Sequence, residues 1–600
     1  MPFTSPAYAP PLPFGPPDTV SVPEFLFGDE KYARCPRAKS KPPFTCGITG
    51  KSYSTAEVAE RIEFLARALA AELGWPVNEG CELDKVVGIF SFNSIDHLTA
   101  SWAVHRLSGV SNPVNVTYTT TQLVDQLTLV RCKALFTCDA LLSRALEAAD
   151  AAGIPREHIY LLPVPSRNKS SSVAGDEGFK TVDQLILEGS QLPPLPALQW
   201  EKGQGARQTA FLIPSSGTSG LPKNVKVSHR NVIAHTMQFA TFESVYRKGD
   251  PELGLGVLPQ FHAYALLCIA HVSVHRGDGV VVLQGFDLDD TLSAIQNLRI
   301  GTLWLVPSMV VAMTKSAPFV RKFDLSSVSA VMVGSSPLTR ETASQFSELL
   351  PGRPFLQGYG LTEVCCVASF STPADTVFGS CGSFLPGLEG RLIDSDGREI
   401  TEPNQPGELL IRSPSVVLGY LGNETATKEM LTEDGWLRTG DLVEIRRSPK
   451  GHDHLFVVDR LKELIKVRGM QVAPAELETF LLLSPMVADV CVVPYPNEAA
   501  GELPRAYIIR AEGLKGAEDE VTRRQLHDYV NDAFPEFKRL AGGIEFVDAL
   551  PKTPSGKTQR KVLKDRARAA YEASKKVVKK LQDTAPVVVQ VFEFDSEEDE

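Results

Sequence analysis

Residues Pro214–Lys226 read PSSGTSGLPKNVK, and an apolar stretch of strand length precedes them. Glycines let the backbone turn its N–H groups toward an anion, hydroxyls add donors, and Lys223 adds positive charge. This is the composition of a loop that binds phosphate, although the Walker A spacing of Gly-x-x-x-x-Gly-Lys-Ser/Thr is absent. A flexible Ser/Gly surface loop remains the alternative. The candidate phosphate contacts are Ser215, Ser216, Gly217, Thr218, Ser219, Gly220 and Lys223.

Short apolar runs lie on both sides of this loop and alternate with segments of helix length. Because such runs do not alternate apolar with polar residues, they are typical of sheets covered on both faces, and they predict an α/β fold. A helix is expected to start after Ser54, which has capping-box spacing to Glu57, and to stop at Gly74. The predicted strands are Val86–Ser91, Gly279–Leu283, Thr302–Val306 and Ala330–Val333.

The character of the chain changes near Asp459, where a charged stretch is followed by a compact unit. We expect a strand pair around Val490–Val493 and Ala506–Ile509, followed by a helix near Val521–Phe534. The sequence therefore predicts a Pro-rich lead-in at 1–25, a large domain at 26–461, a hinge near Lys462 and a small α+β domain at 462–566. Residues 567–600 form a basic helix to about Lys580 and an acidic tail.

Composition excludes several classes of function. The 600 residues carry a net charge of −11, which argues against nucleic acid as the main partner. The ten cysteines show no Cys-x-x-Cys spacing, so neither a disulfide framework nor a zinc site is indicated. The sequence contains no run of 18 or more apolar residues, so a membrane span is not expected. The N-terminal segment is interrupted by prolines and does not have the pattern of a secretory signal. The C-terminal residues DSEEDE differ from the Ser-Lys-Leu peroxisomal signal. We expect a cytoplasmic protein.

Further motifs follow in a fixed order over roughly residues 50–565, and together with the loop they resemble the adenylate-forming superfamily. That superfamily contains acyl-CoA synthetases, 4-coumarate–CoA ligases, luciferases and the adenylation domains of peptide synthetases. The 4-coumarate–CoA ligase branch matches best. The motifs are PQFHAYAL at Pro259–Leu266, VGSSPL at Val333–Leu338, QGYGLTE at Gln357–Glu363, GWLRTGD at Gly435–Asp441, VVDRLKELIKVRGMQVAPAELE at Val457–Glu478 and PKTPSGKTQRK at Pro551–Lys561.

The resemblance implies a large N-terminal AMP-binding domain and a small mobile C-terminal domain. It also implies ATP- and Mg²⁺-dependent activation of a carboxylic acid to acyl-AMP, followed by thioester formation with coenzyme A. An aromatic or a medium- to long-chain aliphatic acid is the expected substrate. Three alternatives stay open: an acyl-AMP ligase that loads a carrier protein, a catalytically idle scaffold, and a luciferase-like oxygenase. Carrier loading ranks lower because no carrier domain is fused to the chain.

Attack of a carboxylate on the α-phosphorus of ATP brings negative groups together, so charge neutralisation and positioning must supply most of the catalysis. The resemblance implies that Lys557 bridges the acyl carboxylate and the α-phosphate. It also implies that Thr362 hydrogen-bonds that phosphate and that Glu363 holds Mg²⁺. His262 lies beside the carboxylate and gates access to it. Taken alone, a lysine on a Pro/Ser/Gly loop is usually solvated, and a lone histidine in an apolar run is more often a core residue.

The remaining assignments concern the nucleotide and the acyl group, and each rests on the resemblance. Tyr359 would stack on adenine, although a lone tyrosine is more often core packing. Asp441 would bind the ribose hydroxyls with Arg460, against the alternatives of a turn aspartate and a surface ion pair. The same motifs contribute Ser335, Ser336, Pro337, Gln357, Gly358 and Gly360 around the nucleotide. The acyl slot would be lined by Tyr264, Gly334, Gly358, Cys366 and Val367.

For the thioester step, the family reorients its small domain about the position of Lys462. The residues that would then face the site are Lys466, Arg468, Gly469 and Gln471, and Gly469 suits a close backbone approach. Two positions depart from the 4-coumarate–CoA ligase pattern. Asn224 replaces the usual glycine after the loop lysine. Gly285 stands where plant ligases often have a lysine near the CoA phosphates, which weakens the coenzyme A assignment.

Overall fold

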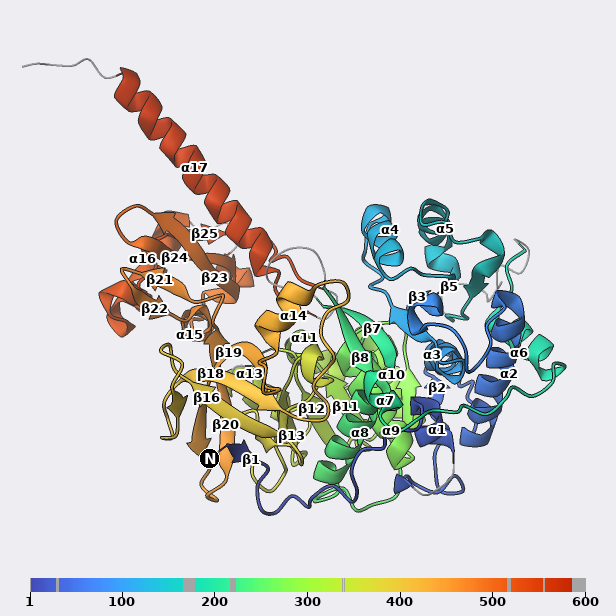
Figure 1. Ribbon diagram of the computed structural model, residues 1–600. Helices are drawn as coiled ribbons and strands as arrows, with labels where there is room; N and C mark the ends of the chain where they lie inside the picture. The colour runs from blue at the N-terminus through green and yellow to red at the C-terminus, as the bar shows by residue number, and fades with distance from the viewer. Residues whose placement is uncertain are drawn as a thin grey trace, which may run out of the picture. The chain divides into compact units, whose positions relative to one another are not determined.

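The computed structural model describes residues 2–28, 32–165, 178–215, 223–336, 338, 340–514, 519–553 and 556–584 (Figure 1). The chain divides into two compact units. Unit 1 comprises Met1–Lys462 together with Lys552–Lys557, and unit 2 comprises Glu463–Pro551 together with Thr558–Glu600. The predicted α/β architecture, with a large N-terminal part and a smaller C-terminal part, is confirmed.

The first sheet of unit 1 has the strand order β6-β5-β3-β4-β7-β8. Its first five strands run parallel and β8 is antiparallel to β7. Successive side chains of β3 enter two different cores, with Val86 and Phe90 on one face and Val87 and Ile89 on the other. Both faces are therefore covered, as the unbroken apolar runs predict. The strands are β3 Val86–Phe90, β4 Val110–Pro113, β5 Ala134–Thr137, β6 Ile159–Leu161, β7 Thr209–Ser215 and β8 Lys223–Ser228.

Helices on the two faces of this sheet account for those cores. Helices α4 (Thr120–Leu129) and α5 (Leu142–Ala151) supply one face, and α2 (Thr55–Leu73), α3 (His97–Arg106) and α6 (Val182–Ser190) supply the other. Helix α2 begins as predicted, because Ser54 and Glu57 form a capping box, and it ends at Gly74 in the left-handed conformation.

The second sheet of unit 1 carries the other predicted strands, in the order β15-β14-β13-β12-β11-β9-β10-β2. The parallel strands are β2 Phe44–Cys46, β9 Leu253–Gly256, β10 Gly279–Val282, β11 Thr302–Leu305, β12 Ala330–Val333 and β13 Phe355–Tyr359. The antiparallel edge strands are β14 Ser369–Phe370 and β15 Ser383–Phe384. Helix α8 (His229–Glu243) and the π-helix η6 (Tyr264–Ala270) share the buried core of this sheet.

A third, antiparallel sheet has the order β1-β16-β18-β19-β20, with β17 paired to β16. The Pro-rich N-terminal segment joins it, because β1 pairs with β16 and the ring of Tyr8 packs 4.7 Å from that of His452. The strands are β1 Phe3–Thr4, β16 Glu389–Ile393, β17 Glu399–Ile400, β18 Gly407–Arg412, β19 Leu437–Arg447 and β20 Asp453–Arg460.

Unit 2 is an α+β fold around the sheet β22-β21-β24-β23, with β25 paired to β24. The predicted strand pair is present, since Val490 lies opposite Ile508 in antiparallel register. The predicted helices are α16 (Asp519–Ala533) and the basic α17 (Arg560–Thr584). The other elements are β21 Ile465–Val467, β22 Met470–Val472, α15 Pro474–Leu481, β23 Val487–Asn497, β24 Gly501–Arg510 and β25 Ile544–Phe546. Within the described residues, no helix has the length and apolarity that crossing a membrane requires.

Candidate functional site

The predicted phosphate loop connects two paired strands of the first sheet. Strand β7 ends at Ser215, which lies opposite Lys223 at the start of β8. The five residues Ser216, Gly217, Thr218, Ser219 and Gly220 fall outside the described part of the chain, so their phosphate contacts stay a prediction. The ammonium of Lys223 lies 4.9 Å from the ring centroid of Tyr420, a cation–π contact. Asn224 is buried and accepts a 2.7 Å hydrogen bond from Gln126, so it serves the packing behind the loop.

Tyr420 contacts two predicted site residues, Lys223 and Glu363. Its hydroxyl donates a 2.9 Å hydrogen bond to Glu363 Oε1, and its backbone forms a β-bridge with Val225. Burial and the negative charge of Glu363 both raise the pKa of Tyr420, so the phenol stays protonated and keeps donating. Sequence reasoning missed Tyr420, because nothing in its local pattern relates it to motifs some 60 and 200 residues away.

Thr362 and Glu363 lie on a short 3₁₀ turn (Thr362–Val364) just after the carboxyl end of β13. In a parallel sheet this is the edge where ligands bind. No group of three or more His, Cys, Asp or Glu side chains that could hold a metal occurs in the described residues. Mg²⁺ usually takes one or two carboxylates and completes its shell with substrate phosphates and water, so a single Glu363 carboxylate fits the predicted ion.

Asp441 lies in β19 and is almost fully buried. Its Oδ2 accepts a 2.7 Å hydrogen bond from the hydroxyl of Tyr359, and its Oδ1 lies 3.0 Å from Nε of Arg460 on the neighbouring strand β20. Burial raises the pKa of Asp441, while the Arg460 charge and the Tyr359 hydrogen bond act in the opposite direction. The three residues that the sequence assigned to adenine and ribose are therefore in direct contact.

The rest of the predicted nucleotide wall follows the ends of β12 and β13. Gln357, Gly358 and Tyr359 form the last part of β13, and Gly360 follows it. Ser335, after β12, has φ +84°, and its Oγ is buried with no hydrogen-bond partner among the described residues. A buried hydroxyl without a hydrogen-bond partner costs free energy, and a ligand atom that bonds to it would remove this cost. Ser336 is exposed, and Pro337 lies outside the described residues.

Lys557 belongs to unit 1 through the short segment Lys552–Lys557. Its ammonium interacts electrostatically with Arg460, Asp441, Glu363 and Cys366. Burial and the positive charge of Arg460 lower its pKa, while Asp441 and Glu363 act to raise it. His262 is affected as well, because burial and the charge of Lys557 lower its pKa to about 3 and keep its imidazole neutral near pH 7.

The predicted acyl slot is assembled from η6, the end of β12 and the turn after Glu363. A Cβ added to Gly334 would lie 3.7 Å from the carbonyl oxygen of Gly358 and 3.7 Å from the ring of Tyr264. The structure therefore brings Gly334, Gly358 and Tyr264 together. The N–H of Val367 donates to Nε2 of the buried His235, 3.2 Å away.

Two further side chains contact residues of the predicted slot and were missed by sequence reasoning. Trp304 lies edge-on to Tyr264, with their ring centroids 6.1 Å apart. Cys268, one turn along η6, forms a side-chain hydrogen bond with Cys366. A spacing of four residues from Tyr264 could have indicated Cys268, since such residues share one face of a helix.

The residues predicted for the thioester step lie on one hairpin of unit 2. Lys466 in β21 pairs with Gln471 in β22, and Arg468 and Gly469 form the turn with φ +49° and +82°. Among the described residues, no atom lies within 4 Å of a Cβ added to Gly469. Gly469 satisfies the positive φ of a two-residue hairpin, and its close backbone approach during the thioester step stays a prediction. Lys462, the predicted pivot, is the last residue of the main segment of unit 1.

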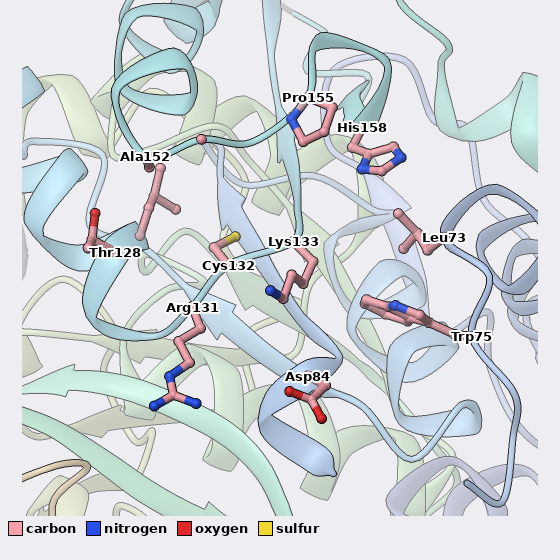
Figure 2. Close-up of a pocket in the computed structure, with 12 residues that line it drawn as sticks. Leu73, Trp75, Asp84, Thr128, Arg131, Cys132, Lys133, Ala152, Pro155 and His158 are labelled. Carbon is pink, nitrogen blue, oxygen red and sulfur yellow. The ribbon is translucent and has the colours of Figure 1, made fainter. Parts of the chain in front are cut away.

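A cavity of about 400 Å³ lies elsewhere in unit 1 (Figure 2). Its walls include Asp84, Lys133 and His158, which precede β3, β5 and β6 and so lie at the amino ends of parallel strands. The C-terminal ends of α4 and α5 also reach it, at Thr128 and Ala152. Helix C-termini carry partial negative charge, which disfavours phosphate. The predicted site residues are absent from the walls, so this cavity is distinct from the site built above.

The family model described as "AMP-binding enzyme" matches residues 33–421, and that described as "AMP-binding enzyme C-terminal domain" matches residues 476–557. The acyl-CoA ligase easD of Emericella nidulans is 40% identical over 94% of this chain and 100% of its own length. The acyl-CoA ligase lcsD of Purpureocillium lilacinum is 55% identical over 59% of this chain and 92% of its own.

Solved structures share the fold at lower identity. The anthranilate CoA ligase AuaEII in complex with anthranoyl-AMP superposes with a TM-score of 0.77 at 22% identity, covering 92% of this chain and 98% of that one. ATP-bound MatB from Rhodopseudomonas palustris gives a TM-score of 0.76 at 23% identity, covering 92% of this chain and 100% of that one. Both likenesses concern the fold alone.

Proposed function

This chain belongs to the AMP-binding enzyme family, and we propose that it is an acid–thiol ligase that activates a carboxylic acid with ATP and passes the acyl group to coenzyme A. Its relatives easD and lcsD carry the name acyl-CoA ligase, which supports this reaction class. The single observation that carries the proposal is the electrostatic interaction of Lys557 with Asp441 and Glu363 in one unit. Three motifs spread over nearly 200 residues supply these groups.

In the first half-reaction, a carboxylate oxygen attacks the α-phosphorus of ATP and the bond to pyrophosphate breaks. The ammonium of Lys557 offsets the negative charge of the carboxylate and of the α-phosphate as they approach. Thr362 donates a hydrogen bond to the same phosphate, and Lys223 with the phosphate loop holds the departing pyrophosphate. Glu363 would hold Mg²⁺, which supplies further charge neutralisation to the phosphates when bound.

The nucleotide is oriented by the cluster around Asp441. Each carboxylate oxygen has two lone pairs, and Tyr359 and Arg460 occupy one on each. One acceptor position on each oxygen remains for the two ribose hydroxyls. The Tyr359 ring and Ser335 then flank the adenine, with the Ser335 hydroxyl, which has no partner among the described residues, available to it.

In the second half-reaction, the thiol of coenzyme A attacks the acyl carbon and AMP leaves. His262 is neutral near pH 7, so it can stand beside the acyl carboxylate without adding a second positive charge to that of Lys557. The hairpin residues Lys466, Arg468, Gly469 and Gln471 would serve this step. The acyl chain lies in the slot of Tyr264, Gly334, Gly358, Cys366 and Val367, which accepts an aromatic or a medium- to long-chain aliphatic acid.

Pyrophosphate release on a panel of such acids, with ATP and Mg²⁺ and with or without coenzyme A, tests the proposal. We expect acid-dependent release that turns over rapidly only with coenzyme A and yields an acyl-CoA. Acyl-AMP accumulation without a CoA effect would instead indicate a carrier-protein acceptor. No release with any acid would contradict the proposal.

Replacing Lys557 should affect the first half-reaction and not the second. Lys557→Ala should abolish acyl-AMP formation, because the charge between carboxylate and phosphate is lost, yet spare thioester formation from supplied acyl-AMP. The two rates are measured separately on the same preparation. Equal loss of both would contradict the role assigned to Lys557.

A further inference from the structure

Two thiols meet inside the proposed acyl slot. Cys268 on η6 forms a side-chain hydrogen bond with Cys366 on the turn after Glu363, and both interact electrostatically with the phenol of Tyr264. The two cysteines are 98 residues apart in the sequence, and both are free thiols. Neither is needed for the chemistry proposed above.

The backbone that carries Cys366 is strained. Cys365 and Cys366 have φ +59° and +103°, a region that residues with a side chain rarely adopt. The turn is also pressed against Gly360, because a Cβ added to Gly360 would lie 1.5 Å from the carbonyl oxygen of Cys366. The unusual backbone of Cys366 is therefore stabilised by its surroundings, and not by its own local preference.

The surroundings of the two thiols differ in a way that sets an order of reaction. Cysteines react with peroxides where they are accessible and lie near positive charge. Cys366 is partly exposed and interacts with the ammonium of Lys557, whereas Cys268 is fully buried. Burial raises the pKa of Cys268, which disfavours its own reaction with peroxide.

We propose that Cys268 and Cys366 are a reversible disulfide site, oxidised by hydroperoxides, whose closure shuts the acyl slot. The Cys366 sulfur attacks one oxygen of hydrogen peroxide, the O–O bond breaks, and a sulfenic acid and water result. The Cys268 sulfur then attacks the Cys366 sulfur, the S–O bond breaks, and a second water leaves. Each disulfide thus consumes one peroxide and releases two waters, and a dithiol reductant reverses it.

The disulfide would narrow the acyl slot by drawing two of its walls together. A covalent S–S bond is shorter than the non-bonded contact of two sulfurs, so its formation draws Cys268 on η6 and Cys366 on the turn together. Tyr264 lies one turn before Cys268 on η6, and Val367 directly follows Cys366. The closing movement therefore draws two slot walls together. The consequence for activity rests on the proposed function, whereas the formation of the bond does not.

Peptide mapping and acid-dependent pyrophosphate release, measured on the same full-length sample with hydrogen peroxide and then with dithiothreitol, test the proposal. We expect a Cys268–Cys366 cross-linked peptide two hydrogens lighter than the reduced pair, with loss of most of the acid-dependent release and recovery on reduction. Cys268→Ser and Cys366→Ser, each compared with its own reduced sample, should lose the reversible inhibition.

The exposed Cys81 supplies a matched control, because Cys81→Ser should retain both the basal activity and the inhibition. Oxidation of Cys366 to sulfenic or sulfinic acid alone, or a bond between the neighbours Cys365 and Cys366, would overturn the proposal. So would a cross-link that leaves activity intact. If the reduced enzyme releases no pyrophosphate with any acid, the proposed function fails, while the peptide map still decides whether the disulfide forms.

Discussion

The hydroxyl of Tyr359 donates a 2.7 Å hydrogen bond to the buried carboxylate of Asp441, from a strand of the second sheet to a strand of the third. The residue that should stack on adenine thereby also orients the residue that should bind ribose. A bond between two sheets of unit 1 fixes the distance between the two halves of the nucleotide site. The contact can be tested separately from the ring that makes it.

Tyr359→Phe should weaken ATP binding while keeping the aromatic face. A hydrogen bond to a charged group contributes about 1.5 kcal/mol, which corresponds to a roughly tenfold rise in KM for ATP. Tyr359→Ala should cost more, because the ring is lost as well. Tyr160→Phe is the control: the Tyr160 hydroxyl is buried without a hydrogen-bond partner among the described residues, and its removal should leave KM unchanged. An unchanged KM in Tyr359→Phe would contradict the link between adenine and ribose positions.

Tyr420→Phe should raise the Mg²⁺ concentration needed for half-maximal pyrophosphate release. The substitution keeps the ring beneath Lys223 but removes the 2.9 Å hydrogen bond that orients Glu363. Mutation of a residue that orients a metal ligand typically lowers metal affinity by about 10- to 100-fold. Tyr420→Leu removes the cation–π contact too and should also raise KM for ATP. Equal Mg²⁺ requirements in Tyr420→Phe and the parent enzyme would refute this positioning role.

Activity should decline on the alkaline side at a lower pH than that at which an ordinary lysine loses its proton. Burial and Arg460 lower the pKa of Lys557, and the charged form exists only below that pKa, so acyl-AMP formation declines as pH rises through it. Lys557→Arg keeps its charge and should remove the alkaline decline, whatever its absolute rate. Arg460→Ala removes a repelling charge and should move the decline to higher pH. A decline at the same pH in all three enzymes would assign it to another group.

The strands and the capped helix could be predicted because their signals are local. Ala330–Val333 forms a strand with the predicted bounds, and Ser54 caps its helix through Glu57 three residues on. Buried apolar runs and capping boxes depend on neighbours within a few residues, so tertiary structure rarely overrides them.

The contacts that organise the site could not be predicted in this way. Tyr420 meets Glu363 only because a loop of unit 1 passes beside β8, and Cys268 meets Cys366 only because η6 packs on the turn after β13. Motif resemblance brought the other site residues to attention without showing which of them touch. Gly469 shows the same limit, since a positive φ and a close approach both select glycine and sequence does not separate them.

Acid should destabilise the protein through its buried histidines, and His97 isolates the effect. Burial alone lowers the pKa of His97 to about 3, from 6.5, and neither ring nitrogen has a hydrogen-bond partner among the described residues. The unfolded chain takes up a proton below pH 6.5 while the folded chain does not. Its contribution to stability is therefore complete above pH 6.5 and is lost as pH falls toward 3.

His97→Leu should flatten this dependence by up to one proton, about 1.4 kcal/mol per pH unit. Free energies of unfolding from urea titrations between pH 5 and 7 measure the slope. Thr99→Val, in the same helix, removes an equally buried polar group that does not titrate, and it should leave the slope unchanged. If His97→Leu and the parent protein lose stability equally as pH falls, the acid sensitivity lies with other groups. The buried ring of His97 would then be protonated in the folded chain, which its apolar surroundings oppose.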